Sequence, residues 1–215
     1  MKKLLIFASG DKVGGGSGFQ KLVESVRDGS LNADIVGVVS NNAEGGVWKR
    51  AQELGIPFFH FPGPYTAENY QSYVAKTRAD FIALSGWLKL VTGLPPERTM
   101  NIHPGPLPRF GGKGMYGHHV HEAVMEAFRR GEVFYSEVCM HFVTKEFDKG
   151  PVFFRCLVDI SSDETPETLA KRVNEAEHKY QSYFTSLVVN GKIYWDGKDP
   201  GTLVGDMEWD FRSRL

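Results

Sequence analysis

Three polar residues, Asn101, His103 and Asp148, have the types and the setting to act on a carbonyl carbon. Asn101 and His103 are two positions apart in the segment TMNIHP, so in a strand both side chains point to the same side. An Asn amide and an imidazolium can stabilise an oxyanion, and each such donor is worth roughly 3–4 kcal/mol when preorganised. The pair therefore predicts acyl transfer.

Asp148 is the candidate partner of His103. It lies in the turn Phe-Asp-Lys-Gly between two apolar segments, where its carboxylate could be held beside the imidazole. A nearby carboxylate raises the pKa of a histidine and can accept or relay a proton. Because no Ser or Cys lies in an evident activating motif, the sequence favours direct transfer over a covalent enzyme intermediate.

A cluster of histidines leaves metal binding open as an alternative. The possible ligands of a hydrolytic zinc site are His103, His118, His119, His121, His141 and Asp148. There is no His-Glu-x-x-His motif, and ordinary loop histidines account for the run HHVH. We therefore expect no metal.

The glycine-rich segment 10–18, GDKVGGGSG, follows the first apolar segment and is similar to phosphate-binding loops. A P-loop requires Lys where Gly16 stands, and a dinucleotide fingerprint requires Gly where Lys21 stands. Anion binding by backbone N–H groups and the start of the next helix remains possible, and a flexible connection is the alternative.

Alternating strands and helices must position these residues. Buried strands are predicted over 4–9, 33–42, 56–61, 80–86 and 99–104, with helices over 19–29, 47–55 and 68–79. This α/β alternation predicts a single-domain open, mostly parallel sheet with helices on both faces. Ligands bind outside the carboxyl ends of strands in such sheets, which is where Asn101 and His103 would lie.

The second half of the chain predicts a C-terminal hairpin and helix extension. After a helix over 121–131, strands over 136–144 and 151–160 can form the hairpin, and Thr165-Pro166 starts a long helix. Earlier in the chain, the segment 87–90, Trp-Leu-Lys-Leu, offers apolar and aromatic walls for a flat ring.

Composition limits the class of protein. The 215 residues carry a net charge of −1, so no global field would attract nucleic acid or an anionic membrane. Cys139 and Cys156 lack metal-site spacing and are expected to be reduced core thiols. The first apolar run, about six residues, is shorter than a signal-peptide core, and none approaches the roughly 18 residues of a membrane span. We expect a soluble, cytoplasmic protein.

Two segments together resemble the signatures of the folate-dependent formyltransferases: NIHPGPLPRF at 101–110 and HFVTKEFDKGPVFF at 141–154. The resemblance spans about residues 1–190 and implies the Rossmann-like formyltransferase fold. It implies a domain over 1–195, with residues 1–100 binding nucleotide and phosphate and 101–195 serving catalysis and folate binding. A C-terminal tail over 196–215 would follow.

Within that family, the chain is most similar to members that formylate glycinamide ribonucleotide in purine biosynthesis. The resemblance implies 10-formyltetrahydrofolate as co-substrate, small-molecule substrates only, no metal, and a monomer or homodimer. Two alternatives stay open. The acceptor could be another amine, such as an amino sugar on a nucleotide, or the chain could be a non-catalytic ligand-binding domain of the same fold.

The resemblance also assigns roles to individual residues. Asn101, His103 and Asp148 match the catalytic residues, with protonated His103 and Asn101 stabilising the oxyanion while Asp148 keeps His103 charged. Binding of phosphate and ribose is implied for Gly16, Ser17, Gly18 and Glu177. Binding of folate is implied for Trp87, Leu88, Lys89, Leu90, Val91, Thr144, Glu146 and Asp148.

Departures from the family pattern surround the substrates. The inserted DKVG at 11–14 lengthens the phosphate loop, Gly18 replaces an Asn, and Lys89 stands where Arg is frequent. Gly105-Pro106 replaces Ser-Leu, and the stretch 111–116 is longer than usual. The reaction type is therefore better supported than the identity of the acceptor.

Overall fold

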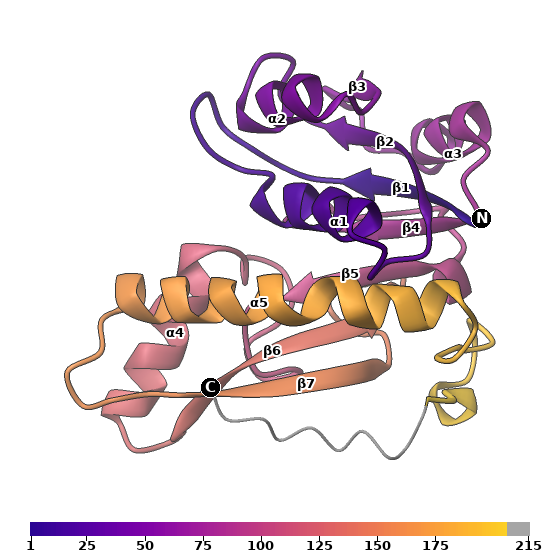
Figure 1. Cartoon of the computed structure of the whole chain (residues 1–215). Helices are drawn as coiled ribbons and strands as arrows, with labels where there is room; N and C mark the ends of the chain where they lie inside the picture. The colour runs from indigo at the N-terminus through magenta and orange to yellow at the C-terminus, as the bar shows by residue number, and fades with distance from the viewer. Residues whose placement is uncertain (206–215) are drawn as a thin grey trace.

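The computed structural model describes residues 1–205, which form an α/β structure around one seven-stranded sheet (Figure 1). The strands are β1 (Lys3–Phe7), β2 (Asp34–Ser40), β3 (Phe58–His60), β4 (Phe81–Leu84), β5 (Thr99–His103), β6 (Tyr135–Phe142) and β7 (Val152–Asp159). The helices are α1 (Ser17–Arg27), α2 (Gly46–Leu54), α3 (Ala67–Thr77), α4 (His118–Arg129) and α5 (Pro166–Val189), with short 3₁₀ turns η1 (Pro96–Arg98) and η2 (Pro200–Thr202).

The sheet changes character at β5. Its order is β3-β2-β1-β4-β5-β6-β7, and the five strands from β3 to β5 are parallel. β6 and β7 are antiparallel and form the hairpin that extends the sheet. The predicted mostly parallel sheet with a C-terminal hairpin and helix is confirmed.

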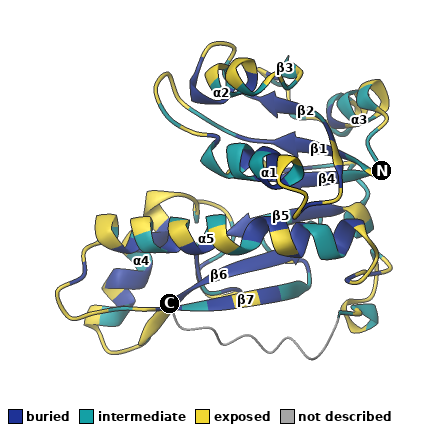
Figure 2. Ribbon diagram, viewed as in Figure 1, coloured by how far each residue is buried: buried dark blue, intermediate teal, exposed yellow. Residues whose placement is uncertain are grey.

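The two faces of the sheet are covered differently. Alternate residues of β1 belong to separate apolar cores. Leu4 and Ile6 belong to the larger core, which also contains residues of α1, α2, α4 and α5, and Leu5 and Phe7 belong to a smaller core that includes Tyr70 of α3. On β5, Met100 and Ile102 belong to the larger core. Asn101, between them, and His103, after them, therefore face the side of the sheet opposite to α5, which lies over β5 and β6 (Figures 1 and 2).

Local signals fix the helices that border this region. Thr165 accepts a hydrogen bond from the Thr168 N–H and Pro166 is the first residue of α5, as its sequence predicts. The helix predicted over 121–131 begins earlier, at His118, because Gly117 with φ of 53° makes the break that precedes it. The run HHVH therefore lies in the first turn of α4.

The C-terminal segment packs on the sheet through Trp195, whose ring lies against Phe142 of β6. Tyr194 and Val204 exchange backbone hydrogen bonds, and Trp195 donates to the Asp199 carbonyl. The predicted tail over 196–215 extends beyond the described residues. Within residues 1–205, no helix is both long enough and apolar enough to cross a membrane.

Candidate active site

The pairing of β5 with β6 sets the catalytic end of the site. Asn101 is directly opposite His141, and its Nδ2 lies 3.1 Å from His141 Nε2. His141 Nδ1 is 2.7 Å from the Phe142 carbonyl, which can only accept, so we assign the His141 proton to Nδ1. Nε2 then accepts from Asn101, and the second N–H of the amide is left for a ligand.

His103 is held in the same way. It is 3% exposed, and its Nε2 donates to the Phe110 carbonyl at 2.7 Å. This assigns the proton of the neutral ring to Nε2 and leaves a lone pair on Nδ1. Nδ1 is therefore the atom that can gain and lose a proton.

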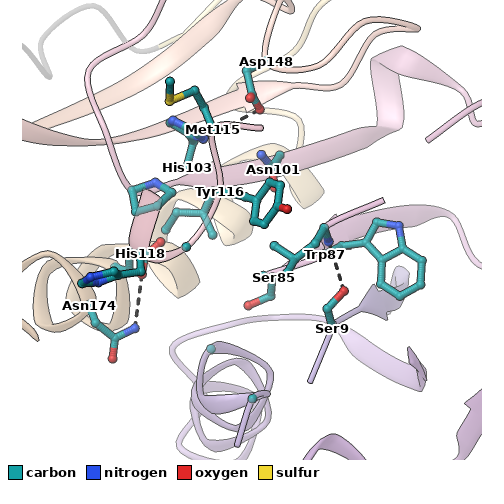
Figure 3. Close-up of a pocket in the computed structure, with 18 of the residues that line it drawn as sticks. Ser9, Ser85, Trp87, Asn101, His103, Met115, Tyr116, His118, Asp148 and Asn174 are labelled. Carbon is teal, nitrogen blue, oxygen red and sulfur yellow. Dashed lines mark hydrogen bonds and ion pairs between the residues drawn. The ribbon is translucent and has the colours of Figure 1, made fainter. Parts of the chain in front are cut away.

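Asp148 comes to this pair from the loop between β6 and β7. Its Oδ1 is 3.8 Å from His103 Nδ1 and 3.4 Å from His141 Nε2, and its Oδ2 accepts from the Gly112 N–H at 2.9 Å. The backbone of Asp148 is left-handed, with φ of 55°, a conformation that Asp tolerates better than most residues. Figure 3 shows Asp148, His103 and Asn101 converging. The structure therefore brings together the three predicted catalytic residues.

The pKa values in this cluster are shifted by burial and by charge. Burial lowers the pKa of His103, and the negative charge of Asp148 opposes that effect without cancelling it. Burial raises the pKa of Asp148, but the adjacent imidazole rings of His141 and His103 and the hydrogen bond from the Gly112 N–H bring that pKa below its usual value. The direction for His103 is opposite to the expectation that Asp148 keeps it charged, because desolvation outweighs the ion pair.

The segment after His103 is fixed at several points. His103 binds the Phe110 carbonyl, Asp148 binds the Gly112 N–H, and Arg155 donates to the Leu107 carbonyl at 2.9 Å. Arg155 also pairs with the buried Glu137 of β6 at 2.7 Å. Hydrogen bonds therefore hold residues 104–112 in a fixed conformation next to the predicted catalytic residues.

The predicted phosphate end of the site lies between β1 and α1. Gly16, with φ of 80°, precedes α1, whose first turn contains no acidic residue. Gly18 allows close packing, because a Cβ there would lie 2.3 Å from Ser85 Oγ. Unsatisfied N–H groups at the start of a helix and its dipole attract anions. The segment therefore has N–H groups and space for an anion, and phosphate binding by Gly16, Ser17 and Gly18 stays a prediction.

The inserted residues 11–14 lie outside the cavity lining. Asp11 binds the N–H groups of Val13 and Gly14 through its carboxylate, and Gly10 and Gly15 form an isolated β-bridge. The turn packs on the start of α2, where a Cβ at Gly46 would lie 2.3 Å from the Gly14 carbonyl. The lengthened loop is thus a compact turn placed away from the ligand side.

Helix α5 supplies the opposite wall. Burial raises the pKa of Glu177 to about 7, and a hydrogen bond from Asn174, 3.2 Å away, opposes this effect. The next residue, His178, lies 3.1 Å from Ser17 Oγ. Sequence reasoning selected Glu177 but missed His178; its position directly after Glu177, on a helix facing the glycine loop, is the signal that was available.

The sequence indicates His121 only as a possible metal ligand, and not as part of the substrate site. It lies on α4, lines the cavity and is 5% exposed, and its Nδ1 has no hydrogen-bond partner among the described residues. Burial, with the nearby His118 and His103, lowers the pKa of His121 to about 4. It is therefore a neutral imidazole with an unsatisfied buried nitrogen beside the ligand space.

These walls enclose a cavity of about 490 Å³. The predicted residues that line it are Gly16, Ser17, Gly18, Trp87, Leu88, Asn101, His103, Asp148 and Glu177. In Figure 3 the labelled Ser9, Ser85 and Trp87 lie across the cavity from Asp148 and His103. The phosphate end and the catalytic end thus open into one space.

A smaller cleft of about 40 Å³ adjoins this cavity, and Asn101 and Asp148, with Trp87 and Phe147, line both spaces. Its lining contains the remaining predicted folate residues, Lys89, Leu90, Val91, Thr144 and Glu146, together with Trp87 and Asp148. A third cavity, of about 360 Å³, shares Val91, Val143 and Thr144 with the cleft. The cleft therefore borders a larger space behind it.

Trp87 has a more structural setting than predicted. It is 7% exposed, donates from its indole N–H to the Tyr70 hydroxyl at 2.9 Å, and packs edge-on against Phe7. Tyr70 in turn donates to the Leu90 carbonyl at 3.0 Å. This chain of contacts fixes the segment 87–90. Trp87 therefore supports the wall of the cleft, and little of its ring is exposed to a ligand.

The histidines do not assemble a metal site. Within residues 1–205, no group of three His, Cys, Asp or Glu side chains has a geometry that could hold a metal ion. His118 and His119 instead lie on the surface, beside Glu122. Cys139 and Cys156 are both buried and unbridged.

Sequence comparison gives matches over most of the chain. The family described as Formyl transferase matches residues 2–185. The phosphoribosylglycinamide formyltransferase of Arabidopsis thaliana, named as chloroplastic, is 38% identical over 205 residues, which cover 90% of this chain and 68% of the relative. The phosphoribosylglycinamide formyltransferase of Bacillus subtilis is 30% identical over 191 residues, covering 84% of this chain and 91% of the relative.

Solved structures agree with these matches. Glycinamide ribonucleotide transformylase 1 from Geobacillus kaustophilus has a TM-score of 0.73 at 29% identity, covering 88% of this chain and 99% of that one. The corresponding enzyme from Symbiobacterium toebii has a TM-score of 0.80 at 24% identity, covering 96% and 95%, and supports the fold alone.

Proposed function

The chain belongs to the formyl transferase family, and from this we propose that it transfers the formyl group of 10-formyltetrahydrofolate to the amine of glycinamide ribonucleotide, a step in purine biosynthesis. The observation that carries the proposal is the meeting of two ligand spaces at Asn101 and Asp148. Transfer between two substrates requires each to have its own compartment, with the reacting atoms at the junction.

The larger cavity is assigned to the nucleotide. Its phosphate binds the N–H groups at Gly16, Ser17 and Gly18, and the Glu177 carboxyl accepts from the ribose hydroxyls. A ribose phosphate laid between these groups extends its amine toward the catalytic end. The small cleft and its bordering cavity are assigned to the folate ring, and Lys89, which lines the cleft, is assigned to a folate carboxylate.

Asn101 and His103 divide the chemistry of the transfer step. The free N–H of the Asn101 amide stabilises the oxyanion that forms when the amine attacks the formyl carbon. Because its pKa is low, His103 starts neutral, and Nδ1 accepts the proton that the attacking nitrogen loses. The same proton then passes to N10 of the folate as the carbon–nitrogen bond breaks, so His103 ends neutral.

Asp148 acts on the intermediate state. While His103 carries the proton it is an imidazolium 3.8 Å from a carboxylate, in a site largely removed from water. The distance exceeds a direct hydrogen bond, so Nδ1 remains free to donate to the substrate. Asp148 thus stabilises the charge without capturing the proton.

Location and assembly belong to the same proposal. We place the enzyme in the cytoplasm as a monomer or homodimer, acting on small molecules with no nucleic-acid or membrane partner. A chloroplast location is the alternative, because the Arabidopsis relative is named as chloroplastic. Fractionation of the native cell and light scattering of the purified protein test these two points.

The direct test is formyl transfer from 10-formyltetrahydrofolate to glycinamide ribonucleotide, followed by the appearance of tetrahydrofolate and formylated product. Appearance of both supports the proposal. Folate binding without transfer to this acceptor contradicts it, and transfer to a nucleotide-linked amino sugar would favour the second acceptor class. Substrate binding without any transfer would favour a non-catalytic domain.

A further inference from the structure

Arg50 lies on α2, outside the cavity lining, yet its guanidinium is attached to the phosphate loop. Its Nη1 donates to the Gly15 carbonyl at 2.8 Å, and its Nε donates to the Gln20 side-chain carbonyl on α1 at 3.0 Å. Gln20 is itself fixed by donating to Glu24 at 2.9 Å. One guanidinium therefore joins α2, the glycine loop and α1.

The bond to Gly15 fixes the orientation of the next N–H. In a trans peptide the C=O and the N–H point in opposite directions. Because the Gly15 carbonyl points to Arg50, the Gly16 N–H points away from it, toward the side on which Gly15 and Gly16 line the cavity. No acceptor for the Gly16 N–H is found among the described residues.

The charge of Arg50 is also uncompensated locally. No carboxylate in residues 1–205 lies within 4.0 Å of its guanidinium, whereas Arg98, Arg109, Arg130, Arg155 and Arg172 each have such a partner. A positive group bound to a peptide carbonyl polarises the peptide and makes its N–H a stronger donor. An anion bound on the cavity side would be stabilised both by the stronger N–H donor and by the nearby positive charge.

We propose that Arg50 is a positioning residue for phosphate recognition, which aims and polarises the Gly15–Gly16 peptide so that the Gly16 N–H binds the substrate phosphate. The ligand class is a phosphate monoester, and Arg50 acts through the peptide without touching the phosphate. This inference rests on the proposed function, since it assigns the phosphate of the acceptor to the glycine loop.

The chain offers a matched control in Arg27. Its Nη2 donates to the Leu54 carbonyl at 2.6 Å, so it also joins α1 and α2 through a guanidinium and a backbone carbonyl. That contact lies at the other end of both helices, away from the cavity. Arg27→Gln and Arg50→Gln therefore remove similar hydrogen bonds between α1 and α2. Only Arg50→Gln also removes a hydrogen bond to the phosphate loop.

The test compares glycinamide ribonucleotide with its dephosphorylated riboside in both variants. For Arg50→Gln we expect KM for the nucleotide to rise about tenfold, with kcat and KM for the folate nearly unchanged and kcat/KM for the riboside as in wild type. Arg50→Lys, which keeps the charge, should lie between, and Arg27→Gln should match wild type. Two results would overturn the inference: an equal loss of kcat/KM for the nucleotide and the riboside in Arg50→Gln, or the same KM for the nucleotide in Arg50→Gln and Arg27→Gln.

A binding measurement separates this inference from the proposed function. Calorimetric titration with ribose 5-phosphate reports the phosphate site whether or not formyl transfer occurs. Weaker binding by Arg50→Gln, but not by Arg27→Gln, supports the role of Arg50 even if the acceptor proves to be another phosphate ester. Unchanged binding in Arg50→Gln overturns it even if the protein formylates glycinamide ribonucleotide.

Discussion

The catalytic end of the site, on β5 and β6, and the phosphate end, between β1 and α1, present different groups to the same cavity. At the catalytic end the groups are side chains, fixed by strand register, by the hydrogen bonds that Asn101 and His103 donate, and by the hydrogen bond that Asp148 accepts from the Gly112 N–H. At the predicted phosphate end they are mainly backbone N–H groups, and Gly16 and Gly18 carry no side chain that would hinder a close approach. Truncating a side chain should therefore impair function at the catalytic end, whereas adding a side chain should impair function at the phosphate end.

Deleting the Asn101 side chain is expected to give the largest effect. Asn101→Ala removes an oxyanion donor, so kcat should fall by about 10²–10³-fold. KM for the nucleotide should change little, because the phosphate end is untouched. Steady-state kinetics with both substrates check this, and a circular dichroism spectrum controls for folding. Retention of full kcat would remove Asn101 from the mechanism.

Neutralising Asp148 comes next. Asp148→Asn leaves the His103 imidazolium without its counter-charge, and kcat should fall by about 10²-fold. Asp148 raises the pKa of His103, so its loss lowers that pKa further, and the acidic limb of the kcat–pH profile should move to lower pH. A limb that moves to higher pH would contradict the assignment of His103 as the initial base.

Adding one methyl group tests the phosphate end. Gly16 has φ of 80°, and a Cβ there would lie 3.1 Å from Val47, so Gly16→Ala strains the loop. The left-handed backbone alone costs about 1–2 kcal/mol, which corresponds to roughly a tenfold rise in KM for the nucleotide with kcat preserved. Gly29→Ala is the control, since Gly29 has φ of 84° in open space at the far end of α1. Gly29→Ala should lower the melting temperature without changing KM, and equal KM changes in the two variants would contradict the comparison.

Glu177 should give the smallest effect. Its pKa of about 7 means that the carboxylate predominates above neutrality and the acid below it. An ionised carboxyl is the better acceptor for ribose hydroxyls, so KM for the nucleotide should rise about fivefold from pH 8 to pH 6. Glu177→Gln should show a flatter KM profile. A KM profile with the same slope in both proteins would contradict the role of Glu177.

The same carboxyl should affect stability. Its folded pKa lies above the ordinary value of 4.5, so between about pH 4.5 and 7 the folded state binds more protons than the unfolded state. The contribution of Glu177 to the free energy of unfolding is therefore present at low pH and is lost as the pH rises through about 7. Glu177→Gln should be more stable than wild type at pH 8 and similar to it at pH 5, as measured by denaturant unfolding.

Much of the fold could be predicted because local and periodic signals agree. The apolar runs at 4–9, 33–42 and 80–86 became parallel strands, and Thr165-Pro166 began α5. Strand periodicity also placed Asn101 and His103 on one side of β5. Helix α4 was placed less well, because Gly117, rather than the histidines, determines where it starts.

The sequence by itself determined which residues are available for chemistry and which elements carry them, because residue type and spacing are local properties. Only the tertiary structure decided their partners. It set His141 against Asn101 through strand register, placed Asp148 beside His103, and attached Arg50 to the phosphate loop. It also reversed the expected pKa direction of His103, because burial depends on the packing of distant segments and no local spacing encodes it.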